Sequence, residues 1–380
     1  MIKTALRFIR YDRVKSLGVI IGIVISIFLI GQQVGILRFL QGLMGGLVSN
    51  SRTDLAQVWV VDNITRNSNE LAFLDESLVK EVRSVEGVEE AWGVIAAGAT
   101  AKFPNGKSSP VLVIGSEPPL FVAGPRQEKI IDGNLMSLID DEAVSAEYFD
   151  RQTFDYPVGK GTRMEINGKT AWIKVQTRDA RGFAGSFIYT TLSRARFYAS
   201  LPKSTVNAVA VKVRSGFTAD QVADNINGII PNVKAWNAET LRKSTVSYIT
   251  LTSNIGTSIG SLVIFAVISG FFIIGLTLYS AAVDHIRDYG TLKAIGATNG
   301  YITRLILTQS LIFAIAGFLI AAMLLEGFRL GVSNSGLMIR YSLAEYTALF
   351  TITLFISIGS SLFFSIRTIN KVEPASVFRT

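Results

Sequence analysis

Four segments of this chain contain no Asp, Glu, Lys, Arg or His, and they constrain the fold more than any other feature. They are residues 17–37, 244–283, 305–325 and 346–366. Each holds at least 21 residues. A helix of that length spans roughly 31 Å, enough to cross the hydrocarbon core of a bilayer. The sequence therefore predicts an α-helical membrane protein with four transmembrane helices.

The net charge lies in the sequence that flanks these segments. Residues 51–243 contain 23 basic and 23 acidic residues, so the whole formal charge of +8 lies outside them. Eleven basic residues occur before the first segment, between the second and third, and after the fourth: Lys3, Arg7, Arg10, Arg13, Lys15, Arg287, Lys293, Arg304, Arg367, Lys371 and Arg379. Because short cytoplasmic loops retain Lys and Arg, we expect both termini to be cytoplasmic and the large domain to be extracytoplasmic. That domain is neutral, so binding of nucleic acid is not expected.

The expected domain order follows from these segments. It is a cytoplasmic amphipathic helix (1–16), TM1 (17–40), an extracytoplasmic domain (41–250), TM2 with a stalk (251–283), a cytoplasmic coupling loop (284–304), TM3 (305–325), a short outer loop (326–345), TM4 (346–366) and a cytoplasmic tail (367–380). The first apolar segment is longer than the core of a signal peptide, so we expect a retained anchor. The amphipathic helix has two open interpretations, which are docking of a partner and anchoring to lipid headgroups. The long charge-free segment before residue 283 predicts one continuous helix.

The extracytoplasmic domain shows an α+β pattern. Strand, helix and strand signals occur at 57–62, 75–85 and 87–92, and again at 206–213, 218–230 and 231–236, with a capping box at Thr218 and Gln221. Asn-Gly pairs at 105–106 and 167–168 predict two hairpins. We therefore expect a split β-α-β module with a mainly β insertion at 117–203 that makes a second subdomain. The chain has no cysteine, so this domain must fold without disulfides.

No residue pattern in the chain indicates catalysis. Gly-Lys-Ser at 106–108 and Gly-Lys-Thr at 168–170 lack the earlier glycine of a phosphate-binding loop, since Ala101 and Arg163 occupy that position. The single histidine, His285, supplies neither a catalytic triad nor a metal site with several histidines. The acidic run at 140–142 could bind a cation, but a solvated loop is the stronger interpretation. We expect a non-catalytic chain with no cofactor or metal site, and no ion-coupled transport through intramembrane carboxylates.

The cytoplasmic loop has the most specific sequence. We expect a helix that continues out of TM2 and bends at Gly290 and at Gly296. We also expect the side chains of Ile295, Ile302 and Leu305 to be available for docking. Residues 287–297 (RDYGTLKAIGA) resemble the R-x-x-G-x-L-K-A-I-G-A signature of MacB/FtsX-type ABC transporter permeases, and residues 371–379 resemble the terminal pattern of that family. With the order of spans and domain, the resemblance covers essentially the whole chain. It is greatest to the DevC-like branch.

The resemblance implies a permease homodimer in the bacterial inner membrane, with the large domain in the periplasm. ATP and Mg would bind a separate ATPase subunit, whose motion passes through the coupling loop to the periplasmic domain, a process called mechanotransmission. The ATPase-coupling residues would be Ile286, Arg287, Tyr289, Gly290, Thr291, Leu292, Lys293, Ala294, Ile295, Gly296 and Ala297. A membrane-fusion protein and a TolC-like outer-membrane channel would be further partners in the efflux of a lipid, glycolipid, antibiotic or tetrapyrrole.

Small residues in the spans allow helices to pack closely. They form the pairs Gly18/Gly22, Gly31/Gly35 and Gly256/Gly260, and Gln32 and Gln33 lie in the same apolar span. Such pairs can serve a dimer surface or packing within one chain, and both interpretations stay open. Glutamines in a span can bond across helices or meet an amphipathic substrate.

Two other functions remain open beside export. One is FtsX-like signalling, in which the same motion activates a cell-wall hydrolase or a sensor kinase. The other is LolC/LolE-like extraction of lipoproteins, which would use two unlike permeases and a carrier protein. The partners of the chain distinguish these functions from efflux.

Overall fold

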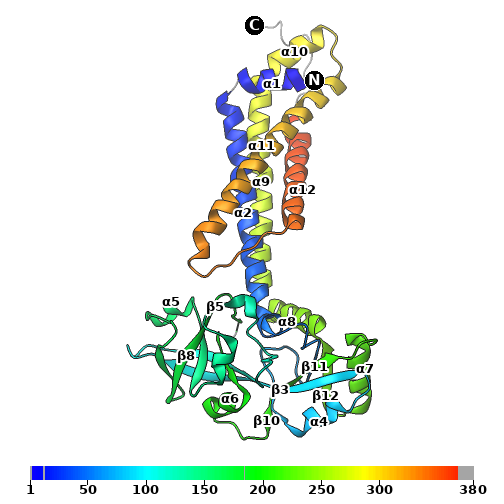
Figure 1. Ribbon diagram of the computed structural model, residues 1–380. Coiled ribbons are helices and arrows are strands. Elements are labelled where there is room, and N and C mark those ends of the chain that lie inside the picture. Colours follow the sequence, from blue (N-terminus) through cyan, green and yellow to red (C-terminus); the bar gives the residue numbers. More distant parts are fainter. Residues whose placement is uncertain (1, 12, 184, 367–380) are drawn as a thin grey trace. The chain divides into compact units, whose positions relative to one another are not determined.

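The computed structural model describes residues 2–11, 13–183 and 185–366 (Figure 1). The tail pattern at 371–379 lies outside the described residues. The chain forms two compact units, which we call the membrane unit (residues 1–39 and 255–380) and the head (residues 40–254).

The described part of the membrane unit consists of helices joined by short turns and loops. Its elements are α1 (Ile2–Tyr11), α2 (Arg13–Met44, which continues into the head), α9 (Ile255–Asp284), α10 (Ile286–Ala294), α11 (Asn299–Ser333), α12 (Leu343–Ser360) and the π-helical turn η3 (Ser361–Ile366). Among the described residues, four helices (α2, α9, α11 and α12 with η3) are long and apolar enough to cross a membrane. Their shared core contains Ile23, Ile27, Ile274, Phe313 and Leu349. The four-span architecture expected from the sequence is confirmed.

The third span is longer than predicted. Helix α11 continues eight residues past Leu325, because Glu326 and Arg329 pair along the helix with an Nε–Oε2 distance of 2.6 Å and nothing there breaks it. It ends at Ser333, three residues before Gly336 with φ of 85°. The outer loop is therefore 334–342 rather than the predicted 326–345.

The prediction of one continuous helix before residue 283 is wrong. Helix α8 (Ala238–Thr252) ends, and α9 starts only at Ile255. Asn254 between them has a left-handed backbone with φ of 57°, which an α-helix does not accept. Helix α2, by contrast, is unbroken from Arg13 to Met44.

The head is built on two interleaved β-α-β units. The first contains β1 (Val58–Asp62), α4 (Ser77–Arg83) and β3 (Val88–Lys102), and the second contains β11 (Ala208–Val213), α7 (Ala219–Ile229) and β12 (Val233–Asn237). The strand order is β12-β1-β11-β3 with antiparallel pairs, the arrangement of a ferredoxin-like split β-α-β fold. The predicted capping box of α7 is present at Thr218 and Gln221. The α+β class expected for the head is thus confirmed.

The remaining strands extend the same sheet. They are β4 (Ser108–Ser116), β5 (Ile130–Asp132), β6 (Ala143–Glu147), β7 (Arg163–Ile166), β8 (Lys169–Thr177) and β9 (Ser186–Thr191). Both predicted Asn-Gly hairpins occur, between β3 and β4 and between β7 and β8. In the described chain ten strands form one sheet, because β3 is long enough to pair with β11, β4 and β7. Residues 117–203 therefore do not form a separate sheet, and the hydrophobic cluster around Ile173 and Ile188 also includes Ile95 and Val113 from β3 and β4.

Smaller elements complete the head. They are α3 (Gly46–Asn50), η1 (Gln127–Lys129), η2 (Leu135–Ile139), α5 (Asp150–Phe154), α6 (Leu192–Ala199) and the short pair β2 (Leu74–Asp75) and β10 (Thr205–Val206). Strands β6 and β9 meet through hydroxyl groups. Tyr189 N donates to Ser145 Oγ at 2.8 Å, and Thr190 Oγ1 donates to Ala143 O at 2.8 Å. A polar seam therefore runs through this part of the head.

Candidate functional site

The coupling loop folds as a short helix between two turns. Helix α9 ends at Asp284, His285 lies between the helices, and α10 follows. His285 Nδ1 lies 2.8 Å from Asp288 Oδ2, in the first turn of α10. A carboxylate in this position interacts favourably with the helix dipole. The predicted bend at Gly290 is wrong, because Gly290 is buried inside α10 and the direction changes at His285 instead.

The predicted bend at Gly296 is present and has a specific geometry. Gly296 has φ of 102° and follows the last residues of α10. Its N–H donates to Lys293 O at 3.0 Å, and the N–H of Ala297 donates to Leu292 O at 2.9 Å. This pair of bonds is a Schellman cap, which satisfies carbonyl groups at the end of the helix and needs a residue that accepts positive φ.

The inner face of α10 is packed against α1 and α11. Tyr289 is buried with Ala5, Ile302 and Leu305. The ring of Phe8 stacks on Tyr289, with centroids 5.8 Å apart and planes at 2°. The expectation that Ile302 and Leu305 are available for docking is therefore wrong, since each is at most 1% exposed. The amphipathic helix α1 uses its apolar face to brace α10.

The outer face of α10 forms an exposed stripe. The members of this stripe recur at helical spacing and are Arg287, Asp288, Thr291, Ala294 and Ile295. The side chain of Ile295 is 77% exposed. Of the other predicted coupling residues, Tyr289, Gly290 and Leu292 belong to the packed face, while Ile286, Lys293 and Ala297 are half-buried. The loop thus combines a rigid inner face with an outer face that carries an apolar side chain and charges.

The glycines of the first span pack within the chain. A Cβ atom on Gly22 would lie 2.8 Å from Ile273 Cγ2, and one on Gly31 would lie 2.5 Å from Leu325 Cδ1. A Cβ atom on Gly35 would lie 2.5 Å from Tyr341 Oη. One on Gly18 would make an ordinary van der Waals contact with Thr277. A Cβ on Gly260 would meet no atom within 4 Å, and Gly256, Gln32 and Gln33 are half-buried. The close packing of α2 is therefore made with α9, α11 and the outer loop of the same chain.

The head contains a buried acidic pair that the sequence patterns did not single out. Glu147, at the end of β6, is fully buried, and Asp150 is 4% exposed. Burial raises the pKa of Glu147, although the hydrogen bonds that its carboxylate accepts lower it. Burial also raises the pKa of Asp150, to about 7. The only sequence signal nearby is the pair Gly182 and Gly185 after β8. A Cβ atom on Gly182 would meet the ring of Phe187, and Gly185 has φ of 134°. The acidic run predicted at 140–142 is different, since Asp141 Oδ1 lies 3.5 Å from Arg194 Nη2.

One family model matches the last three spans and the coupling loop. Residues 260–372 match the family model described as FtsX-like permease C-terminal. The C-terminal part of the chain is therefore similar to FtsX-like permeases. This match supports an ABC transporter permease, a class of membrane protein that works with a separate ATPase.

Solved structures similar to this chain include three extracytoplasmic or permease domains. The periplasmic region of MacB from Actinobacillus actinomycetemcomitans is 12% identical with a TM-score of 0.38, covering 52% of this chain and 94% of that one. The extracellular domain of the noncanonic ABC-type transporter YknZ from Gram-positive bacteria is 12% identical with a TM-score of 0.34, covering 47% and 100%. A domain of a putative permease protein from Porphyromonas gingivalis is 11% identical with a TM-score of 0.34, covering 48% and 90%. No curated protein matches the chain.

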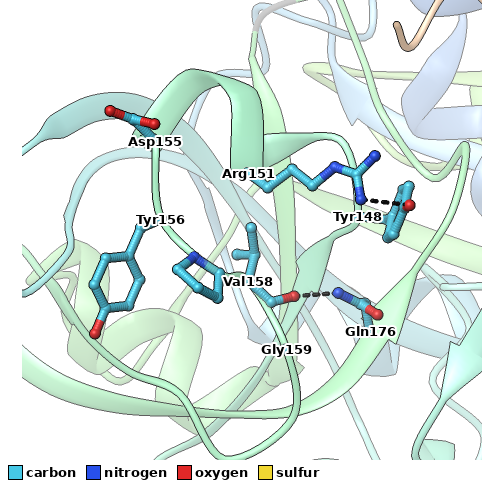
Figure 2. A pocket seen from close by; sticks show the side chains of 8 residues that line it. Tyr148, Arg151, Asp155, Tyr156, Val158, Gly159 and Gln176 are labelled. Carbon is cyan, nitrogen blue, oxygen red and sulfur yellow. Dashed lines mark hydrogen bonds between the residues drawn. The ribbon is translucent and has the colours of Figure 1, made fainter. Parts of the chain in front are cut away.

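The head has an open pocket of about 540 Å³ beside α5 (Figure 2). Tyr148, Tyr156 and Val158 supply its apolar lining. The guanidinium of Arg151 lies 3.9 Å from the centroid of the Tyr148 ring and donates to the Tyr148 hydroxyl. The described residues contain no cluster of three His, Cys, Asp or Glu side chains able to hold a metal ion.

Proposed function

We propose that this permease couples ATP hydrolysis on a separate ATPase to a conformational change of its head, and thereby drives efflux of a hydrophobic or amphipathic substrate. The observation that carries the proposal is the exposed stripe of α10, which is braced from behind by the packed Tyr289. A rigid helix with one exposed apolar side chain and flanking charges has the form of a protein docking site. The resemblance to the DevC-like branch adds a membrane-fusion protein and an outer-membrane channel as partners, and a second copy of the permease.

Recovery of the ATPase tests the docking site. Replacing Ile295 with Asp is expected to lower the amount of ATPase that co-purifies with the tagged chain at least tenfold, since loss of one central contact commonly costs more than about 1.4 kcal/mol. The matched control is Ile64→Asp, because Ile64 in the head is 74% exposed and takes the same substitution. If both variants recovered the same amount of ATPase, α10 would not be the docking site.

Mass spectrometry of the same native complex tests the choice of function. A membrane-fusion protein among the partners supports efflux. A cell-wall hydrolase or a sensor kinase would instead establish signalling, and a second, unlike permease with a carrier protein would establish lipoprotein extraction. Recovery of no ATPase at all would refute the proposal.

The proposed orientation rests on the charge distribution and has its own test. Arg151 is an exposed residue of the head, and Ile295 is an exposed residue of the coupling loop. The chain has no cysteine, so Arg151→Cys and Ile295→Cys each create a single thiol. In cells with an intact inner membrane, we expect an impermeant maleimide to label Cys at position 151 and to reach position 295 only after lysis. The opposite pattern would invert the topology.

A further inference from the structure

The buried carboxylate of Glu147 holds the loop that follows β8. It accepts hydrogen bonds from Thr177 Oγ1 at 2.9 Å, from Asp179 N at 2.8 Å and from Ala180 N at 3.1 Å. An ionised carboxylate can accept several bonds at once, and bonds to a charged acceptor are the stronger kind. Two successive backbone N–H groups of the loop therefore depend on this one side chain.

The same loop is hydrogen-bonded to the segment where α2 enters the head. Asn50 Nδ2 donates to Arg181 O at 3.0 Å, and Phe183 N donates to Leu43 O at 2.9 Å. Gly46 lies so close that a Cβ atom there would be 2.4 Å from Arg181 O. Residues 178–183 thus connect the Glu147 carboxylate on one side with residues 43–50 on the other.

Residues 43–50 are the end of the only uninterrupted connection between the described parts of the two units. Helix α2 runs without a break to Met44, whereas the return connection is interrupted at Ser253 and Asn254. A continuous helix transmits displacement along its axis better than two helices joined by a left-handed residue. The attachment of α2 in the head is therefore the position where a fixed loop matters most.

We propose that Glu147 is a positioning residue, which holds residues 178–183 and through them fixes the last turn of α2 in the head. The consequence for transport rests on the proposed function, because the fixed attachment then carries the motion driven by the ATPase. The neighbouring Asp150 has a different role. In the described chain Asp150 accepts a hydrogen bond from Ser186 Oγ at the start of β9, and the charge of Arg181 also acts on it.

Amide hydrogen exchange on the purified full chain tests the attachment without any partner. In Glu147→Gln the side chain keeps one acceptor oxygen, so the amides of 178–183 and 43–50 should exchange at least tenfold faster, while those of β3 and β4 stay protected. Asp150→Asn is the matched control, a buried carboxylate three residues away, and should leave both segments protected. Unchanged exchange in Glu147→Gln would overturn the proposal, and so would equal loosening in the control.

A second variant tests the proposal if Glu147→Gln speeds amide exchange throughout the head. Thr177→Val keeps the carboxylate and removes one of its three donors. It is expected to speed exchange in 178–183 by a smaller factor with β3 and β4 unchanged. Exchange equal to that of the unaltered chain would overturn the proposal.

A coupling measurement distinguishes positioning from plain stability. In the complex with its ATPase, MgATP with vanadate is expected to change exchange of the head in the unaltered chain and in Asp150→Asn, but not in Glu147→Gln. A nucleotide response that survives in Glu147→Gln would refute the coupling role. If the unaltered chain recruits no ATPase, the proposed function fails, while exchange on the chain alone still decides the role of Glu147.

Discussion

Replacing Gly296 with valine is expected to lower recovery of the ATPase with the permease at least tenfold. Gly296 closes the Schellman cap of α10 with φ of 102°. A left-handed backbone costs an L-residue roughly 1–2 kcal/mol, and a β-branched side chain fits it worst. The end of α10 should therefore unwind and displace Ile295, which is the exposed residue just before the cap.

The matched control for this change is Gly300→Ala. Gly300 lies in the first turn of α11, where a Cβ atom would meet only Thr298 Oγ1 at 3.9 Å, an ordinary contact. Recovery of the ATPase and the exchange rate of the Ala297 amide should both stay unchanged in the control. If both also stay unchanged in Gly296→Val, the cap is not needed for docking.

Replacing Asp150 with Asn is expected to stabilise the head above pH 7. Asp150 is buried beside Glu147 and the charge of Arg181, and burial raises its pKa from 3.8 to about 7. A carboxyl with a raised pKa in the folded state stabilises that state fully below its unfolded pKa, and this contribution is lost as the pH rises to about 7. The interval corresponds to roughly 4 kcal/mol at 1.36 kcal/mol per pKa unit. The Asn side chain stays neutral and can still accept from Ser186.

Tryptophan fluorescence can follow this effect in the full chain. All four tryptophans, Trp59, Trp92, Trp172 and Trp236, belong to the head. The melting temperature of the unaltered chain should fall between pH 5 and pH 8, and that of Asp150→Asn should fall much less. Asp155→Asn, at an exposed carboxylate paired with Lys107 at 3.1 Å, is the control and should melt like the unaltered chain. A variant curve parallel to the unaltered one would contradict the prediction.

Local signals in the sequence were enough to predict the spans, the hairpins and the capping box of the head. Uncharged segments report burial in a bilayer directly, and Asn-Gly pairs report positive φ in a two-residue turn. Thr218 and Gln221 form the predicted capping box, because both partners lie within one helical turn. The class of the molecule could therefore be predicted from short stretches of residues.

Features that depend on distant parts of the chain were predicted less well. Ser253 and Asn254 interrupt a segment whose composition suits a helix, and the left-handed backbone of Asn254 is not visible in that composition. Ile302 and Leu305 look available in the sequence, but α1 covers them. Glu147 resembles a surface residue, since no local pattern shows that Thr177 and the following loop will surround it.

The chain enters and leaves the head at neighbouring positions. Helices α3 and α8 pack together, with Thr250 Oγ1 at 3.6 Å from Met44 Sδ and a Cβ on Gly45 placed 2.6 Å from Arg242 Cγ. A domain whose two ends adjoin can be inserted into a host polypeptide, or removed from it, without spreading the flanking segments. Exchange of whole heads between related chains is thus possible without rebuilding the helical scaffold.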